Sequence, residues 1–131
     1  MDGPPVHNVN QFDNNDQFRA QITYLTAHVG VTCSHFLNLY TEDDLTYVRY
    51  MPPKGAVELA VAESMPRLGE NVQLVWRDRG FHCVIDARVS RINASDNSFA
   101  VFAGWNAPED LRGISGALCW NKKTALGIVT G

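Results

Sequence analysis

Short runs of β-forming residues, separated by turn signals, constrain the fold of this 131-residue chain most strongly. Val, Ile, Thr and aromatic side chains dominate these runs, and such side chains are typical of strands. No segment shows convincing helical periodicity. Many short strands at regular spacing predict an all-β barrel or sandwich. The expected strands cover residues 22–35 (with a bend at Gly30), 36–40, 45–51, 57–62, 72–76, 81–92, 98–104, 117–120 and 124–129.

Polar composition separates the beginning of the chain from the rest. Residues 1–17 are rich in Pro, Asn, Asp and Gln, so we expect a flexible N-terminal arm there. The length allows one domain, or two very small sub-domains that share a core. We expect residues 18–66 to form an N-terminal β half and residues 67–131 a C-terminal β half.

Composition and charge exclude several classes of protein. A hydrophobic content of 45% and a charged content of 19% describe an ordinary globular chain, and the net charge of −3 gives no global basic character for nucleic acid. No apolar run is long enough to span a bilayer, and no secretory signal is visible. One local basic cluster fits solvated strand positions better than an RNA-contact patch: Arg77, Arg79, Arg88 and Arg91.

Cysteine usage favours a reducing compartment. Cys33, Cys83 and Cys119 are odd in number and lack C-x-x-C spacing, which argues against a disulfide framework. His82 and Cys83 form a lone adjacent pair without a second pair of ligands at metal spacing, so no metal site is expected.

A glycine-flanked serine begins the last predicted strand pair. In Gly113-Ile114-Ser115-Gly116 the glycines allow a tight turn that leaves the hydroxyl uncovered. The amides of Gly113 and Ser115 can then face one point, where an oxyanion would sit. The motif therefore makes Ser115 a candidate nucleophile. The alternative interpretation is a glycine-rich turn between two strands.

A serine nucleophile needs a base, and the base needs an orienting carboxylate. We expect His35, at a strand end, to be the base in preference to His28. Glu58 is the favoured carboxylate because an acid that opens an apolar strand is uncommon without a partner. Asp43 and Asp44 are held in reserve, since Asp44 follows His35 by only nine residues. The alternatives are a surface histidine and a glutamate on a solvated strand face.

Four motifs in order resemble those of chymotrypsin-like serine proteases. Thr32-Cys33-Ser34-His35 is similar to the T-A-A-H motif, and Glu58-Leu59-Ala60-Val61 to the D-x-A-x motif. Residues 113–116 resemble the G-x-S-G motif, and residues 127–131 the strand that pairs with extended substrate. The spacings of 23 residues from histidine to glutamate, and of 57 from glutamate to serine, resemble those of compact proteases of positive-strand RNA viruses.

This resemblance implies a fold and an activity. The fold would be two small antiparallel β-barrels with a cleft between them, the second barrel being incomplete if the chain stops at Gly131. The activity would be that of a serine endopeptidase that processes a viral polyprotein in the host cell cytoplasm, without a cofactor. The alternative is a catalytically silent domain of the same fold that binds RNA or a protein partner. The oligomeric state stays open.

The resemblance also assigns roles to residues. Ser115 would attack, His35 would take its proton, and Glu58 would orient the imidazole. The amides of Gly113 and Ser115 would form the oxyanion hole. Two further roles concern the substrate: Ile128, Val129 and Thr130 would bind its main chain, and Glu109 would bind a basic side chain on the acyl side of the cut.

Overall fold

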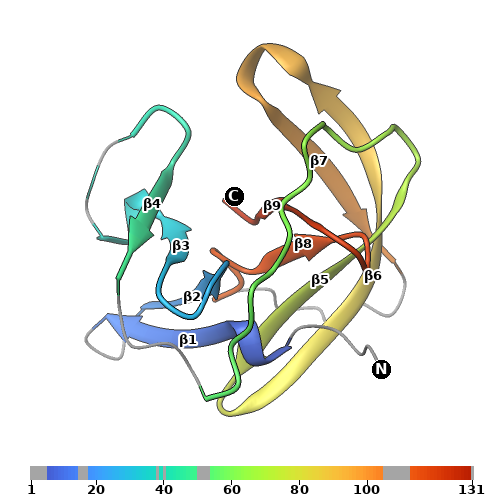
Figure 1. Cartoon of the computed structure of the whole chain (residues 1–131). Helices are drawn as coiled ribbons and strands as arrows, with labels where there is room; N and C mark the ends of the chain where they lie inside the picture. The colour runs from blue at the N-terminus through green and yellow to red at the C-terminus, as the bar shows by residue number, and fades with distance from the viewer. Residues whose placement is uncertain are drawn as a thin grey trace.

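A computed structural model describes residues 6–14, 18–37, 39, 41–49, 54–104 and 113–130. Within these residues the chain forms a four-stranded and a five-stranded antiparallel sheet (Figure 1). The predicted all-β class is therefore confirmed. No helix in the described part of the chain is long and apolar enough to cross a membrane.

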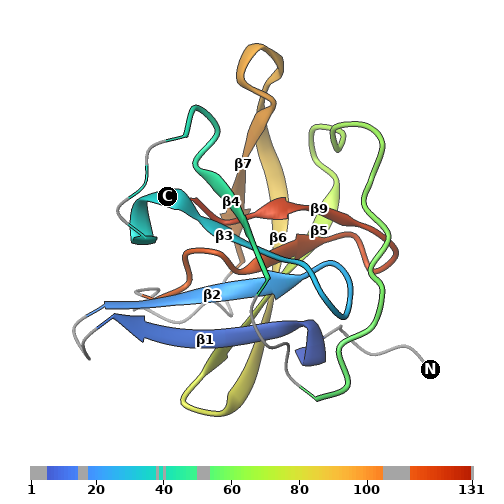
Figure 2. The same ribbon diagram turned by 60° about the vertical axis from the view of Figure 1, so that its left-hand side comes forward.

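The first sheet follows chain order. Its strands are β1 (Val9–Asn14), β2 (Phe18–Tyr24), β3 (Gly30–Cys33) and β4 (Leu45–Val48), and each pairs with the next. Figure 2 shows β1 and β2 as the long pair of this sheet, with β3 and β4 above them. Two short 3-10 helices flank its strands: η1 (Val6–Asn8) and η2 (Ser34–Leu37).

The second sheet has the order β7-β6-β5-β8-β9. A long hairpin of β5 (Asn71–Asp78) and β6 (Phe81–Asn93) dominates it, and its register shifts near Val89 where β6 pairs with the next strand. The 3-10 helix η3 (Ala94–Asp96) connects the hairpin to β7 (Ser98–Ala103), which forms one edge. The remaining strands are β8 (Leu118–Trp120) and β9 (Ala125–Ile128), with β9 at the other edge.

The expected flexible arm over residues 1–17 needs a correction, because residues 9–14 form β1 and pair along β2. Val9 and Asn8 are fully buried. The side-chain amide of Asn8 donates to the carbonyls of Tyr24 and Val57, each at 2.6 Å, so its burial leaves no hydrogen-bonding group unsatisfied. Asn8 is thus a polar residue of this stretch that serves the interior of the fold. Residues 1–5 and 15–17 lie outside the described residues.

The single strand expected over residues 22–35 is divided by a turn. β2 ends at Tyr24 and β3 begins at Gly30. The hydroxyl of Thr26 accepts from the amides of His28 and Val29, both at 3.0 Å, and closes the turn without a proline. The strand expected over residues 36–40 is not formed at its start, because the 3-10 helix η2 includes Phe36 and Leu37; residues 38 and 40 lie outside the described residues.

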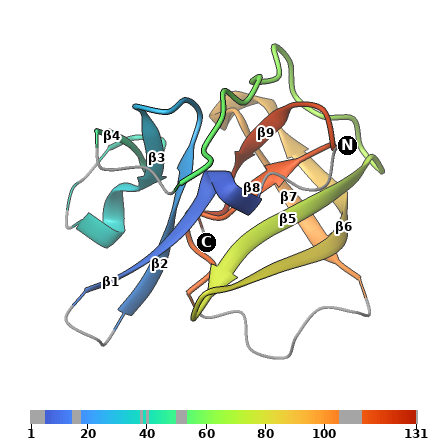
Figure 3. The ribbon, with the colours of Figure 1, turned by 60° about the horizontal axis from the view of Figure 1, so that its bottom comes forward.

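Residues 57–62, expected as a buried strand, instead run between the two sheets as an irregular segment (Figures 1 and 3). Only Leu59 is buried in this segment, and its amide donates to the carbonyl of Leu25 in the first sheet's turn. The amide of Ala62 donates to the carbonyl of Ala125 in β9. The segment therefore fastens one sheet to the other.

Two apolar clusters hold the molecule together. One lies within the second sheet and includes Leu74, Trp76 and Ile85. The other joins both halves, because Val9 of β1 packs in it with Leu118 of β8. The predicted boundary between residues 66 and 67 falls between the strands of the two sheets, but the halves share this second core.

Candidate active site

His35 is held by two hydrogen bonds to one carboxylate. Its backbone amide donates to Oδ1 of Asp44 at 2.8 Å, and its Nδ1 lies 2.5 Å from Oδ2 of the same residue. The side chain of His35 is 51% exposed and that of Asp44 is 30% exposed. With Nδ1 directed at the carboxylate, Nε2 is the nitrogen that remains for proton transfer.

The turn before β4 places Asp44 beside the histidine. The amide of Ser34 donates to the carbonyl of Asp44 at 2.8 Å, and the buried hydroxyl of Ser34 lies within 2.7 Å of the hydroxyls of Thr41 and Thr46. Asp44 has φ of 59°, in the left-handed region that Asp adopts more readily than most residues. Hydrogen bonds therefore join η2, which carries His35, to the turn that carries Asp44.

Glu58 does not occupy the place that the sequence analysis gave it. The adjacent Leu59 binds Leu25, in the turn that precedes β3, whereas His35 follows the other end of β3. Four residues of strand span about 13 Å. The Glu58 side chain is exposed and has no hydrogen bond or ion pair with any described residue. The carboxylate beside Nδ1 of His35 is that of Asp44, and the exposed His28 lies in the turn near Leu25.

The serine loop is clamped by the first sheet. The backbone amide of Gln21 donates to the carbonyl of Ser115 at 2.7 Å, and its side-chain amide donates to the carbonyl of Gly113 at 2.9 Å. The hydroxyl of Thr23 donates to the carbonyl of Gly116 at 2.9 Å. Neighbouring residues of β2 thus fix the backbone on both sides of Ser115. Sequence analysis missed both clamp residues, although the polar Gln21 between Ala20 and Ile22 could have signalled a buried role.

Glycine is required in this loop for conformation and for space. Gly113 and Gly116 have φ of 86° and 90°, which favours glycine. A Cβ atom at Gly116 would lie 2.0 Å from the carbonyl oxygen of Gln21. The amides of Gly113 and Ser115 donate to no described residue. Two uncommitted amides in a fixed loop are what an oxyanion hole needs.

Cys33 connects the serine loop to the histidine. Its thiol donates to the carbonyl of Val129 at 3.0 Å and interacts with the backbone of Gly116. Burial, reinforced by the charge of Asp44, raises the pKa of the Cys33 thiol to about 12. The Cys33 sulfur lies within 4.8 Å of the ligand atoms of His35 and Asp44. The loop that carries Ser115 therefore reaches the corner of the fold that holds His35.

The reacting atoms themselves are not bonded to each other. Neither the Ser115 hydroxyl nor Nε2 of His35 has a hydrogen-bond partner among the residues that the structure describes. Catalytic hydrogen bonds often tighten only when substrate is bound.

The predicted substrate strand is partly used inside the protein. The amide of Val129 donates to Ala117, and its carbonyl accepts from Gly116. Ile128 lines an apolar cavity of about 170 Å³ between the sheets, together with Val31 and Tyr47 of the first sheet. Glu109 lies outside the described residues. Binding of a substrate main chain by Ile128, Val129 and Thr130 stays a prediction.

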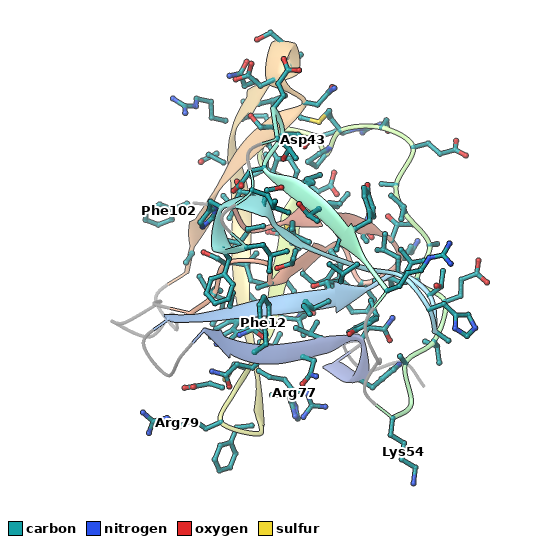
Figure 4. All side chains as sticks on the ribbon, turned by 90° about the vertical axis from the view of Figure 1, so that its left-hand side faces the viewer. Phe12, Asp43, Lys54, Arg77, Arg79 and Phe102 are labelled. Carbon is teal, nitrogen blue, oxygen red and sulfur yellow. The ribbon has the colours of Figure 1, made fainter. Side chains whose placement is uncertain are left out.

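Two arginines of the predicted basic cluster, Arg77 and Arg79, lie far from Asp43 (Figure 4). Figure 4 shows Arg77 and Arg79 at one end of the molecule and Asp43 at the other. The guanidinium of Arg77 donates to the carbonyls of Val9 and Gly80, so this arginine already has partners within the protein. RNA contact stays a prediction.

Comparison with known proteins identifies the fold. No family model and no curated protein matches the sequence. The structure is similar to that of the Rv3671c protease in its inactive form, with a TM-score of 0.65 and 13% identity, over 97% of this chain and 79% of that one. It is also similar to an inactive mutant of a chimeric murine norovirus NS6 protease, with a TM-score of 0.58 and 16% identity, over 95% of this chain and 86% of that one. The chain has the chymotrypsin-like fold, as predicted.

Proposed function

We propose that this chain is a serine endopeptidase in which Ser115, His35 and Asp44 carry the chemistry. One observation supports the proposal most: a carboxylate holds Nδ1 of His35 at the corner where Cys33 meets the clamped serine loop. Orientation of the imidazole and rigid presentation of the nucleophile are the two conditions that such a mechanism sets.

The mechanism follows from these positions. The Ser115 hydroxyl attacks the scissile carbonyl while its proton passes to Nε2 of His35. Asp44 stabilises the imidazolium that forms, and the amides of Gly113 and Ser115 stabilise the oxyanion. His35 then gives the proton to the leaving amine, and water, deprotonated by the same nitrogen, releases the acyl group from Ser115.

For the substrate we propose a viral polyprotein cut in the cytoplasm of the host cell. The motif spacings support this choice, as does the likeness to the norovirus protease, which carries a cleavage junction in its extended C-terminus. An extended segment would lie between the sheets, against Ile128 and Thr130, with an apolar side chain in the cavity beside Ile128. A basic residue bound by Glu109 stays a prediction.

The test is Ser115→Ala, with the exposed Ser64→Ala as the matched control. Loss of the nucleophile should remove about 10⁶ in rate, as in other enzymes of this mechanism. A fluorophosphonate probe should label the wild-type and control proteins and leave the Ser115→Ala protein unlabelled. Retention of most peptide cleavage by Ser115→Ala would overturn the proposal.

A second candidate function is a silent domain of this fold that binds a polypeptide without cutting it. The missing hydrogen bond between the Ser115 hydroxyl and His35, among the described residues, favours it. If the wild-type protein binds peptides but resists both cleavage and the fluorophosphonate probe, this candidate replaces the first.

A further inference from the structure

Three different metal-binding side chains meet at the end of β3. The sulfur of Cys33, an imidazole nitrogen of His35 and a carboxylate oxygen of Asp44 all lie within 4.8 Å of one another. Within the described part of the chain this is the one group of its kind. The cluster was not expected from the sequence, in which His82 and Cys83 are the one adjacent His–Cys pair.

The donor set fits Zn²⁺ better than it fits Ca²⁺ or Mg²⁺. Thiolate, imidazole and carboxylate are the ligands that Zn²⁺ takes in tetrahedral sites, whereas Ca²⁺ and Mg²⁺ prefer oxygen ligands alone. Three protein ligands leave the fourth position to water, which can enter because the side chains of His35 and Asp44 are partly exposed.

The cluster is also held in place before any metal arrives. The carbonyl of Asp44 accepts from Ser34, and its Oδ1 accepts from the amide of His35, so only Oδ2 is directed at the imidazole. Partners of this kind around a ligand orient it and raise metal affinity. Little chain movement is therefore needed to bring three ligands around one ion.

We propose that Cys33, His35 and Asp44 form a Zn²⁺ site that switches the active site off. The ion would enter between Nδ1 of His35 and Oδ2 of Asp44 and bind the sulfur of Cys33. Binding removes the thiol proton to solvent and breaks the bond from Cys33 to the carbonyl of Val129.

The inhibition follows from the imidazole tautomer. When Nδ1 coordinates the ion, the single proton of the neutral ring resides on Nε2. That nitrogen can no longer accept a proton from Ser115, and Asp44 no longer orients the ring. The inhibitory consequence rests on the proposed peptidase function, but the metal site itself does not.

The experiment measures Zn²⁺ binding directly, by calorimetry on the reduced full chain, and repeats it with Co²⁺ as a spectroscopic probe. Wild-type protein should bind one ion and show thiolate-to-cobalt charge-transfer absorption. Cys33→Ser and Asp44→Asn should each weaken Zn²⁺ binding by at least about tenfold, and Cys33→Ser should abolish the charge-transfer band. Cys83→Ser, at a partly exposed thiol outside the cluster, is the matched control and should bind as wild type does.

The outcomes separate the two proposals. Equal Zn²⁺ binding by wild type and Asp44→Asn, or a Co²⁺ complex without the charge-transfer band, would overturn the site even if Cys33→Ser fails to fold. Zn²⁺ binding by a protein without peptidase activity would support the site and refute the proposed function. Peptidase activity that is unaffected by saturating Zn²⁺ would overturn the switch.

Discussion

The interiors of the two sheets differ in the polarity of their buried side chains. The buried polar side chains of the described structure all come from the first sheet and its flanks: Asn8, Gln21, Thr23, Thr32 and Ser34. The interior of the second sheet consists of apolar residues such as Val72, Leu74 and Trp76. Apolar packing is non-directional, whereas a hydrogen bond requires a defined distance and angle.

The two sheets contribute differently to the candidate site. Gln21 and Thr23 direct their hydrogen bonds at the backbone of the serine loop, and Ser34 directs its own at the turn that carries Asp44. The second sheet supplies a stable support, and the first sheet sets the positions of groups around the site. Four substitutions or titrations would test this difference between the sheets.

The first prediction asks which acid orients His35: Asp44, in a turn of the first sheet, or Glu58, in the segment between the sheets. Asp44→Asn should lower the rate of peptide cleavage by about 10⁴, because the wrong imidazole tautomer would be favoured. Glu58→Gln should leave the rate within about twofold, since the Glu58 side chain is exposed and substitutions of exposed side chains usually have small effects. Steady-state kinetics on both variants decide between the two acids, and the reverse result would return the role to Glu58.

The clamp and the apolar core should respond differently to substitution. Gln21→Met leaves the carbonyls of Gly113 and Arg77 without their donor and the amide of Arg77 without its acceptor, which costs about 1–3 kcal/mol for each group left unsatisfied, and it should also lower kcat. Leu74→Ala should cost about 2–5 kcal/mol of unfolding free energy and leave kcat unchanged in the folded protein. Urea unfolding and kinetics are measured on the same samples. Equal effects on kcat would show that the clamp has no positioning role.

A glycine pair tests the close approach of the serine loop to β2. Gly116→Ala should cost about 2–4 kcal/mol of unfolding free energy, because backbone strain adds to the overlap with Gln21. Gly69→Ala is the control, since Gly69 has a similar φ of 84° but no atom within 4 Å of an added Cβ. It should cost about 1–2 kcal/mol, from backbone strain alone. Equal losses in urea unfolding would argue against the close contact.

Titration of two buried thiols compares the interiors of the two sheets, because Cys33 lies in β3 of the first sheet and Cys119 in β8 of the second. Burial raises the pKa of Cys33 and of Cys119 from 9.0 to about 12. The unfolded chain therefore loses these protons first, so the free energy of unfolding should fall as pH rises from about 9 to about 12. Cys119→Ser should flatten part of this pH dependence of urea unfolding. At pH 8 the partly exposed Cys83 should be alkylated before the other two, as mass spectrometry would detect.

Much of the second sheet could be predicted from the sequence. The hairpin of β5 and β6 was expected within two residues at its ends, because apolar side chains alternate and Arg79-Gly80 supplies the turn. The strands of the first sheet were harder to predict from the sequence, because polar residues such as Asn8 and Gln21 fill interior positions. The turn after Tyr24 lacks glycine and proline and depends on the hydroxyl of Thr26.

The candidate site was predicted in part. Ser115 and His35 were proposed from the sequence because glycines and a strand end leave a local pattern, and the structure places Asp44 beside His35. Asp44 was held in reserve because nine residues appeared too few for a strand and its return. The chain instead uses a 3-10 helix and a turn, which fold back within that length.

The distance along the chain between the clamp and the loop has a consequence for folding. Gln21 reaches Gly113 across 92 residues, and Cys33 reaches Val129 across 96. Contacts between residues so distant in sequence form slowly, since closing a long loop costs entropy before any contact compensates for it. A nascent chain on the ribosome would therefore complete β1 to β4 without a formed serine loop. The clamped serine loop would form only after the last strands have been synthesised.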